Sequence, residues 1–136
     1  MEKTSVTPIV LPASSHSLLS HDYAPARDML SAGLQVALGS DFSPSNWTLG
    51  PLTVAAIAAR ELRMKSDEII RGITINAAKG LGVDRSVGSL GPGKAADLVI
   101  LKAPSHKWIG YTYGEGIVDK VLIAGKEEVS EGKRVN

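Results

Sequence analysis

The sequence predicts an α/β fold in which parallel strands are connected through a helix. Two short apolar runs, residues 6–11 and 35–40, have the aliphatic and β-branched composition of buried strands. Between them, residues 24–32 show the spacing of a short amphipathic helix, with Pro25 suited to its first turn and Gly33 to its C-terminal stop. Strand, helix and strand in this order form a βαβ unit, whose two strands are parallel.

The connections and the middle of the chain follow from the same patterns. Residues 13–23 are polar and serine-rich and show neither a helical nor a strand period, so we expect a loop there. A turn-rich connection over residues 43–51 follows the second strand. Apolar residues then recur at helical spacing in three stretches, and we expect helices that begin near Pro51, Ser66 and Thr74. Ser66 is expected to cap the second of these helices.

The C-terminal third of the chain is β-rich. Residues 88–93 are a glycine-containing turn cluster that precedes the apolar run 98–101, and residues 117–123 and 127–129 flank 124–126 as an expected hairpin. The turn cluster precedes a strand instead of opening a helix, and no Walker-type Lys-Ser or Lys-Thr follows it, which argues against a phosphate-binding loop. We therefore expect a domain or layer boundary at the start of this region.

Composition excludes several classes of function. The 136 residues are 43% hydrophobic and carry a net charge of +1 without a basic run, which argues against binding to nucleic acid or to an anionic membrane. The absence of cysteine excludes thiolate metal sites, so a metal would be held by His, Asp or Glu. No apolar run approaches the ~20 residues of a membrane span and no secretory signal is visible, so we expect a cytoplasmic location.

Asp41 is the first candidate functional residue. It follows the second apolar run directly, after Gly39 and Ser40, and proline-broken polar sequence comes next. In α/β folds the carboxyl ends of parallel strands carry the chemistry, and a carboxylate placed there suits metal binding or proton transfer. An Asp after a strand is equally common as a turn former or helix N-cap, so both interpretations stand at this point.

The histidines and tryptophans give weaker signals. His16, His21 and His106 are the only histidines, and no two of them have the i, i+2 or i, i+4 spacing that places imidazoles on one metal. His16 or His21 could face a ligand from the serine-rich segment, but an exposed histidine is the commoner outcome. Trp47 and Trp108 are more typical of packing than of a stacking platform for bases.

Three motifs, taken in order, resemble the C-terminal third of the amidohydrolase superfamily. They are Gly39-Ser40-Asp41 at a strand end, the sequence TINAAKGLG over 74–82, and the sequence GSLGPGKAADLVIL over 88–101. Within that superfamily the chain is most similar to the imidazolonepropionase family, the cyclic amidases of histidine breakdown. The segments that carry this similarity are residues 11–13, 23–27, 36–44 and 108–111.

The resemblance implies a particular place in a larger fold. Residues 1–84 would be the C-terminal portion of a (β/α)₈ TIM barrel, with 6–11 and 35–40 as its seventh and eighth strands, and residues 85–136 would belong to a small composite β-domain. A complete barrel has eight strands and about 250 residues, so we expect this chain to be part of a longer protein. Bare strand edges and apolar faces would then favour self-association or a homodimer.

The resemblance also implies a reaction. One divalent metal, zinc or iron, would activate water to attack the lactam carbonyl of 4-imidazolone-5-propanoate, a small cyclic amide, giving N-formimidoyl-glutamate. Asp41 would be a metal ligand and would transfer a proton between that water and the leaving nitrogen. Ser43, Ser45 and Asn46 occupy the positions of the substrate-contacting loop, where the family typically carries Asn, Gly and Thr or Ser. The family's metal-binding histidines have no counterpart in these residues, so we expect the chain to be inactive alone.

Two other hypotheses remain open from the sequence. The segment Gly93 to Val99 is shared across the superfamily, which leaves another cyclic amidohydrolase or aminohydrolase, dihydroorotase-like or guanine-deaminase-like, as the enzymatic alternative. The other hypothesis is that the chain is a non-catalytic α/β module, in which Asp41 only caps a turn.

Overall fold

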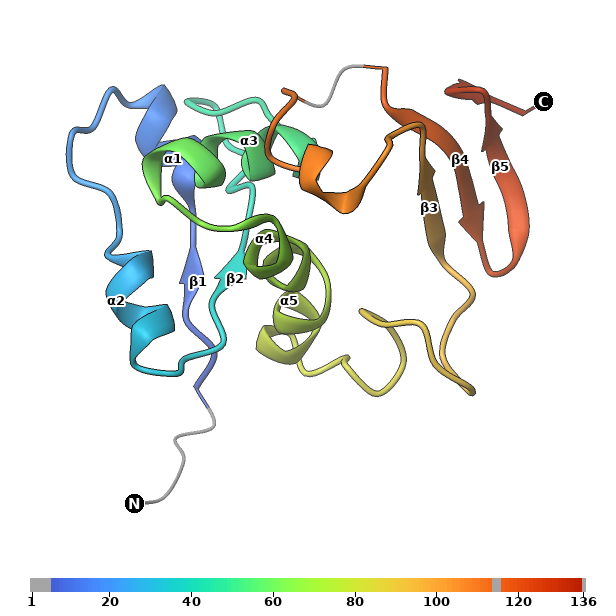
Figure 1. Cartoon of the computed structure of the whole chain (residues 1–136), viewed down its shortest axis with the longest axis horizontal. Helices are drawn as coiled ribbons and strands as arrows, with labels where there is room; N and C mark the ends of the chain where they lie inside the picture. The colour runs from blue at the N-terminus through green and yellow to red at the C-terminus, as the bar shows by residue number, and fades with distance from the viewer. Residues whose placement is uncertain (1–5, 114–115, 136) are drawn as a thin grey trace.

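The computed structural model describes residues 6–113 and 116–135 and has the predicted α/β class. Two parallel strands lie among helices, and a separate antiparallel sheet lies beside them (Figure 1). The elements are, in order, β1 (Ile9–Val10), α1 (Pro12–Ser17), α2 (Ala26–Ser31), β2 (Ala37–Leu38), α3 (Pro51–Glu61), α4 (Ser66–Ile73), α5 (Ile75–Gly80), β3 (Leu98–Leu101), the 3-10 helix η1 (His106–Trp108), β4 (Val118–Ile123), β5 (Lys126–Ser130) and β6 (Lys133–Arg134).

Strands β1 and β2 form the predicted parallel pair. Ile9 lies opposite Ala37 and Val10 opposite Leu38. The N–H of Ala37 donates to the Pro8 carbonyl at 2.8 Å, and the N–H of Gly39 donates to the Val10 carbonyl at 3.0 Å. Each strand is shorter than its apolar run because, in the part of the chain that the structure describes, only this shared edge is hydrogen-bonded. The closure of a barrel is not seen within these residues.

Helix α1 corrects the expectation of a loop over residues 13–23. Pro12 begins the helix, where its missing N–H costs nothing and its fixed φ suits the first turn. Pro12 and Ala13 are buried, and α1 packs against α3. Packing on another helix thus overrides the weak helical preference of this serine-rich segment. The expected loop is confined to the residues between α1 and α2.

The other helices lie where the sequence predicts them, with one correction at the start of α4. Lys65, not Ser66, is the N-cap residue, and its backbone N–H donates to Glu68 Oε2 at 2.7 Å. Ser66 is the first helical residue, and its hydroxyl donates to the Lys107 carbonyl of η1 at 3.5 Å. The Glu68 carboxylate, in the first turn of the helix, therefore satisfies the backbone N–H of the N-cap residue.

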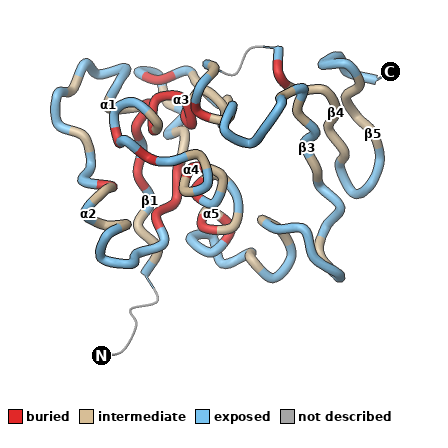
Figure 2. The backbone as a smooth tube through the Cα atoms, in the orientation of Figure 1, coloured by how far each residue is buried: buried red, intermediate tan, exposed pale blue. Residues whose placement is uncertain are grey.

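The core lies between the parallel strands and the helices that cover them. Figure 2 shows the buried backbone concentrated in β1, in β2 and in the facing sides of α3, α4 and α5. Gly72 brings α4 close to β2, because a Cβ at that position would lie 3.0 Å from Leu38 Cγ. The Asn76 amide donates at 2.9 Å to the carbonyl of Val36, the residue before β2, and ties α5 to the start of the same strand. Both helices are therefore fixed on β2.

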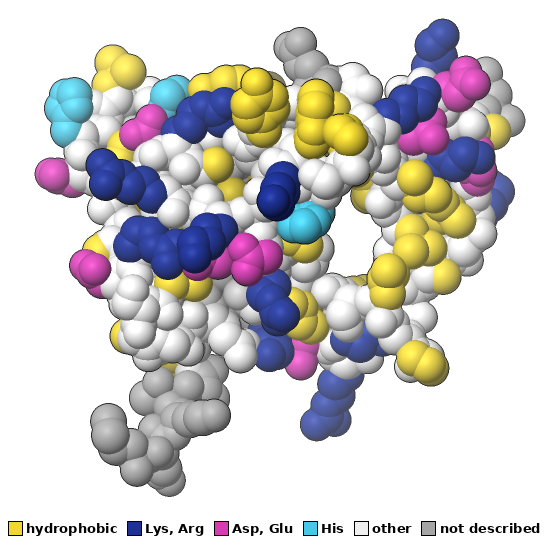
Figure 3. All heavy atoms as spheres, in the orientation of Figure 1, with side chains coloured by type: hydrophobic (Ala, Val, Ile, Leu, Met, Phe, Trp, Pro, Cys, Tyr) yellow, Lys and Arg dark blue, Asp and Glu magenta, His cyan; other side chains and the backbone are white. Residues whose placement is uncertain are grey.

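The antiparallel sheet has the order β3-β4-β5-β6 and includes the predicted hairpin, formed by β4 and β5. Val99 lies opposite Val121, and Val121 lies opposite Val129. The sheet leaves apolar side chains in solvent, with Val99 59% and Ile100 47% exposed. The molecular surface has an opening between this sheet and the helical part (Figure 3). The sheet therefore gains little burial from the helices that are described.

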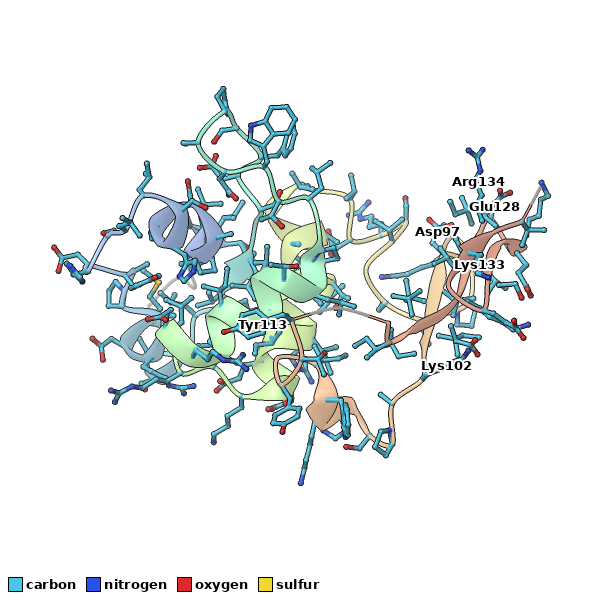
Figure 4. The ribbon with its side chains drawn as sticks, turned by 90° about the horizontal axis from the view of Figure 1, so that it is seen from above. Asp97, Lys102, Tyr113, Glu128, Lys133 and Arg134 are labelled. Carbon is cyan, nitrogen blue, oxygen red and sulfur yellow. The ribbon has the colours of Figure 1, made fainter. Side chains whose placement is uncertain are left out.

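The segment that leads from η1 toward the sheet is attached to the helical part through Arg60. Its guanidinium donates to the carbonyls of Gly110 and Tyr111, each at 2.9 Å, and lies 4.4 Å from the ring centroid of Tyr113. Figure 4 shows Tyr113 over the helical part, whereas Lys102, Glu128 and the other labelled residues lie on the sheet. Among the helices described, none has the length and apolar character needed to cross a bilayer.

Candidate functional site

Asp41 lies at the carboxyl end of β2, directly after Gly39 and Ser40, and its side chain is exposed. Its φ of +52° is unusual for a residue other than glycine, although Asp tolerates this left-handed conformation better than most side chains. The Ser14 hydroxyl, in helix α1, donates to Asp41 Oδ2 at 2.6 Å. Because α1 follows β1, residues that come after two neighbouring parallel strands meet at this point.

Asn46 is the buried member of the same loop, with only 3% of its surface exposed. Its amide nitrogen donates to the Ser40 carbonyl at 2.6 Å and to the Asp41 carbonyl at 3.3 Å. Its side-chain oxygen accepts the Thr48 backbone N–H at 3.3 Å. Reciprocal backbone hydrogen bonds between Asn46 and Ser43, at 2.9 and 3.0 Å, close the turn. The Asn46 side chain is therefore occupied in holding the backbone of its own loop.

Of the other loop residues, Phe42, Ser45 and Trp47 are exposed and Ser43 is half-buried. The hydroxyls of Ser43 and Ser45 are 3.2 Å apart and form a hydrogen bond. Phe42 and Trp47 pack edge to face with their ring centroids 5.4 Å apart, and they are 47% and 79% exposed. Asp41, Ser43, Ser45 and Asn46, the site residues that the family resemblance implies, thus lie on one loop that follows β2.

The donor set of the described residues does not amount to a metal centre. In residues 6–113 and 116–135, no three or more His, Asp or Glu side chains are grouped so that they could hold a metal ion. A catalytic zinc is usually held by three protein ligands and a water. Asp41 is of a suitable type for one such ligand, because a carboxylate binds a divalent cation through oxygen. Further ligands would have to come from outside the described residues.

His16 and His21 lie on a different surface feature, an open groove between α1 and α3. The groove has a volume of about 450 Å³ and is also lined by Tyr23 and Glu61. The Tyr23 hydroxyl and His16 Nδ1 are 3.4 Å apart. Burial and, to a smaller extent, the Glu61 charge raise the pKa of the Tyr23 hydroxyl. Asp41 does not line this groove, and the prediction of exposed histidines here is confirmed.

Comparisons with known proteins decide the family. A model of the amidohydrolase family matches residues 1–127. The chain belongs to the amidohydrolase family. This amidohydrolase chain is 37% identical over 136 residues to an imidazolonepropionase from Treponema denticola, covering 99% of this chain and 33% of the relative. It is 40% identical over 123 residues to an imidazolonepropionase from Bacillus velezensis, covering 90% of this chain and 29% of the relative.

A solved structure supports the same assignment at the level of the fold. A zinc-bound adenosine deaminase from Xanthomonas campestris superposes with a TM-score of 0.81 and 25% identity, covering 94% of this chain and 33% of that one. The resemblance to amidohydrolases that the sequence predicts is therefore confirmed. The amidohydrolase chain spans about a third of the length of the curated relatives that it matches.

Ser14 is the one residue at this site that the sequence reasoning missed. It lies in the segment that was expected to be a loop, among several other serines, and nothing in its local pattern distinguishes it. The available signal is its position, because it follows the first apolar run as Asp41 follows the second. In a parallel pair the residues after both strands reach the same edge, so the rule that selected Asp41 also applies to Ser14.

Proposed function

We propose that this chain supplies the carboxyl-terminal part of an imidazolonepropionase-like amidohydrolase, which hydrolyses the cyclic amide C–N bond of 4-imidazolone-5-propanoate to N-formimidoyl-glutamate. The observation that carries the proposal is the position of Asp41 at the carboxyl end of a parallel strand, next to the end of its neighbour. Identities of 37% and 40% to imidazolonepropionases support this substrate over others in the family.

In this proposal the two halves of the chain belong to different parts of the enzyme. Strands β1 and β2 are the seventh and eighth strands of a (β/α)₈ barrel, of which residues 1–84 form the last portion. Residues 85–136 belong to a composite β-domain. The exposed apolar residues of the antiparallel sheet support this division, because a second layer packed on the sheet would bury them.

We assign Asp41 two roles, as one ligand of a divalent metal, zinc or iron, and as the group that moves the proton. When bound, such a metal lowers the pKa of water and polarises a carbonyl. The Asp41 carboxylate accepts a proton from the attacking water and delivers it to the leaving ring nitrogen. We assign the hydroxyls of Ser43 and Ser45, which lie 3.2 Å apart on the same loop, to hydrogen bonding with the substrate.

An aminohydrolase is the second candidate function. It is favoured by the superposition on the Xanthomonas campestris adenosine deaminase, a relative at 25% identity. An aminohydrolase would use the same carboxylate at the strand end for proton transfer to a leaving amine instead of a ring nitrogen. The lower identity places this candidate second.

Two composite proteins distinguish the candidates. The first, called the composite enzyme, is the Treponema denticola imidazolonepropionase in which this chain replaces the residues that match it. In the second, it replaces the matched residues of the Xanthomonas campestris adenosine deaminase. Both are assayed with 4-imidazolone-5-propanoate and with adenosine, after circular dichroism and size-exclusion chromatography have established that each is folded. We expect hydrolysis of 4-imidazolone-5-propanoate by the composite enzyme. Activity of the second composite alone would contradict the proposal.

A further inference from the structure

We propose that Ser14 and Asn46 are positioning residues for Asp41, Ser14 by fixing its carboxylate and Asn46 by fixing its backbone. This inference rests on the proposed function of Asp41. It adds Ser14, which lies outside the loop of β2, to the site. It also gives Asn46 a role other than the direct substrate contact that the family resemblance implies for its position.

The first constraint acts on the side chain of Asp41. The 2.6 Å separation between Ser14 Oγ and Asp41 Oδ2 is typical of a hydroxyl that donates to an ionised carboxylate. Within the described parts of the chain, hydrogen bonds to this carboxylate involve Oδ2. One oxygen is therefore held by α1, and Oδ1 is left to face a cation or a water molecule.

The second constraint acts on the backbone. The Asn46 amide donates to the carbonyls of Ser40 and Asp41, which lie on either side of the Asp41 Cα. A residue with φ near +52° persists when its surroundings determine that conformation, and such residues cluster at functional sites. The two hydrogen bonds and the turn closed by Ser43 and Asn46 provide this determination.

The burial of Asn46 separates its role from that of the serines. Its amide nitrogen and its side-chain oxygen both make hydrogen bonds to backbone groups, and only 3% of the residue is exposed. If the Asn46 side chain contacted the substrate instead, the backbone groups that it now bonds would be left without hydrogen-bond partners, which is unfavourable in a buried position. Ser43 and Ser45, in contrast, offer hydroxyls near the surface. Asn46 therefore acts on the substrate through Asp41.

The test uses the composite enzyme with Ser14→Ala, the hydroxyl-retaining Ser14→Thr, and Ser15→Ala as the neighbouring control. The measurements are kcat, KM and the Co²⁺ dissociation constant of the metal-free protein by titration. We expect Ser14→Ala to lower kcat or weaken Co²⁺ binding about tenfold, as removal of outer-shell partners of a metal ligand does, with KM within twofold. Ser14→Thr should retain most of both values, and Ser15→Ala all of them.

Asn46→Asp and Asn46→Ala test the backbone constraint. Asn46→Asp preserves the side-chain oxygen and the shape of the residue but removes the amide donor. We expect both variants to lower kcat about tenfold or more with little change in KM. A rise in KM at unchanged kcat would overturn the positioning role, because it is the result expected of a substrate contact. Melting temperatures measured in parallel show whether a variant remains folded, and Ser14→Ala keeps the proposal testable if Asn46 variants do not fold.

Asp41→Asn separates this inference from the proposed function. If Asp41→Asn abolishes activity while Ser14→Ala and Asn46→Asp leave kcat and Co²⁺ binding within twofold, only the positioning inference is overturned. If Asp41→Asn retains full activity and full Co²⁺ binding, the proposed function fails and the positioning inference fails with it.

Discussion

At the scale of single residues, Glu68 shows how one side chain can join two helices. It accepts the Lys65 N–H at the start of α4 and a hydrogen bond of 2.5 Å from Arg27 of α2. Burial raises the pKa of the Glu68 carboxyl, but these hydrogen bonds and the Arg27 charge outweigh burial and hold the pKa below its usual value of 4.5. The charged form of Glu68 is therefore favoured by folding.

This shift predicts a pH dependence of stability. Because the pKa of Glu68 is lower in the folded than in the unfolded protein, its contribution is fully present above pH 4.5 and is lost as the pH falls through the folded-state pKa. Thermal melts of the chain between pH 7 and pH 3 should show a smaller acid-induced loss of stability for Glu68→Gln than for the wild type. Glu131→Gln, in the turn between β5 and β6, is the control, and an equal effect from it would contradict the assignment.

Gly88 illustrates a residue whose identity is set by contact with another element. Its φ is +87°, and a Cβ there would lie 2.6 Å from Ala78 Cβ and 3.1 Å from Ile75 Cα. Gly88→Ala should therefore reduce the free energy of unfolding by at least about 2 kcal/mol, through steric overlap and backbone strain. Gly91→Ala is the matched control, since no neighbouring atom lies within 4 Å of its Cβ position, and it should change stability by less than about 0.5 kcal/mol. Urea denaturation measures both, and equal effects would exclude this explanation.

At the scale of elements, the attachment of α5 to β2 depends on a buried amide. Asn76 is 7% exposed and donates to the Val36 carbonyl, whereas Lys79 of the same helix makes an exposed hydrogen bond to Gln35 at 2.7 Å. Asn76→Ala should cost about 1–3 kcal/mol of unfolding free energy because it leaves a buried carbonyl unpaired. Lys79→Ala should cost less than about 0.5 kcal/mol. Chemical denaturation of both variants is the measurement, and a larger loss from Lys79→Ala would contradict the assignment.

Local sequence patterns were sufficient for the elements whose signal is periodic. The parallel pair, α2, α3, α5 and the hairpin of β4 and β5 follow from apolar spacing and turn residues. Helix α1 could not be predicted in this way, because it depends on burial of Pro12 and Ala13 against α3. The N-cap of α4 was predicted at Ser66, but the N-cap residue is Lys65, whose backbone N–H donates to Glu68, and the Ser66 hydroxyl donates to the Lys107 carbonyl instead.

The site was predictable to a similar extent. Asp41 was selected because it follows the second apolar run, and the structure places it after the carboxyl end of β2; its functional role stays a prediction. The burial of Asn46 was not predictable, because a polar residue in a turn-rich segment gives no local sign that it will bond to the backbone of residues five and six positions earlier. The contact of Ser14 with Asp41 could be predicted only once β1 and β2 were known to be neighbouring strands.

At the scale of the whole molecule, the described strands leave edges and apolar faces in contact with solvent. β3 and β6 are the edges of the antiparallel sheet, and Val99 of β3 is 59% exposed. Exposed edge strands with apolar side chains pair readily with other chains. The chain as given should therefore associate with itself when it is isolated.

Sedimentation velocity over a range of protein concentrations tests this expectation. We expect species heavier than the 14.3 kDa monomer and a shift toward them with concentration. Val99→Lys, which places a charge on the edge strand, should reduce association more than Leu90→Lys, which replaces an 80% exposed leucine in the turn cluster. A single monomeric boundary at every concentration would contradict the expectation.

The central claim is that Asp41 serves as a metal ligand and proton-transfer group of an amidohydrolase. The most direct measurement is the metal content of the composite enzyme, by inductively coupled plasma mass spectrometry, together with its rate of 4-imidazolone-5-propanoate hydrolysis, for wild type and Asp41→Asn. The account predicts that Asp41→Asn lowers the rate at least about 100-fold and reduces the bound zinc or iron. A variant that keeps its full metal content and a rate within twofold of wild type would contradict it.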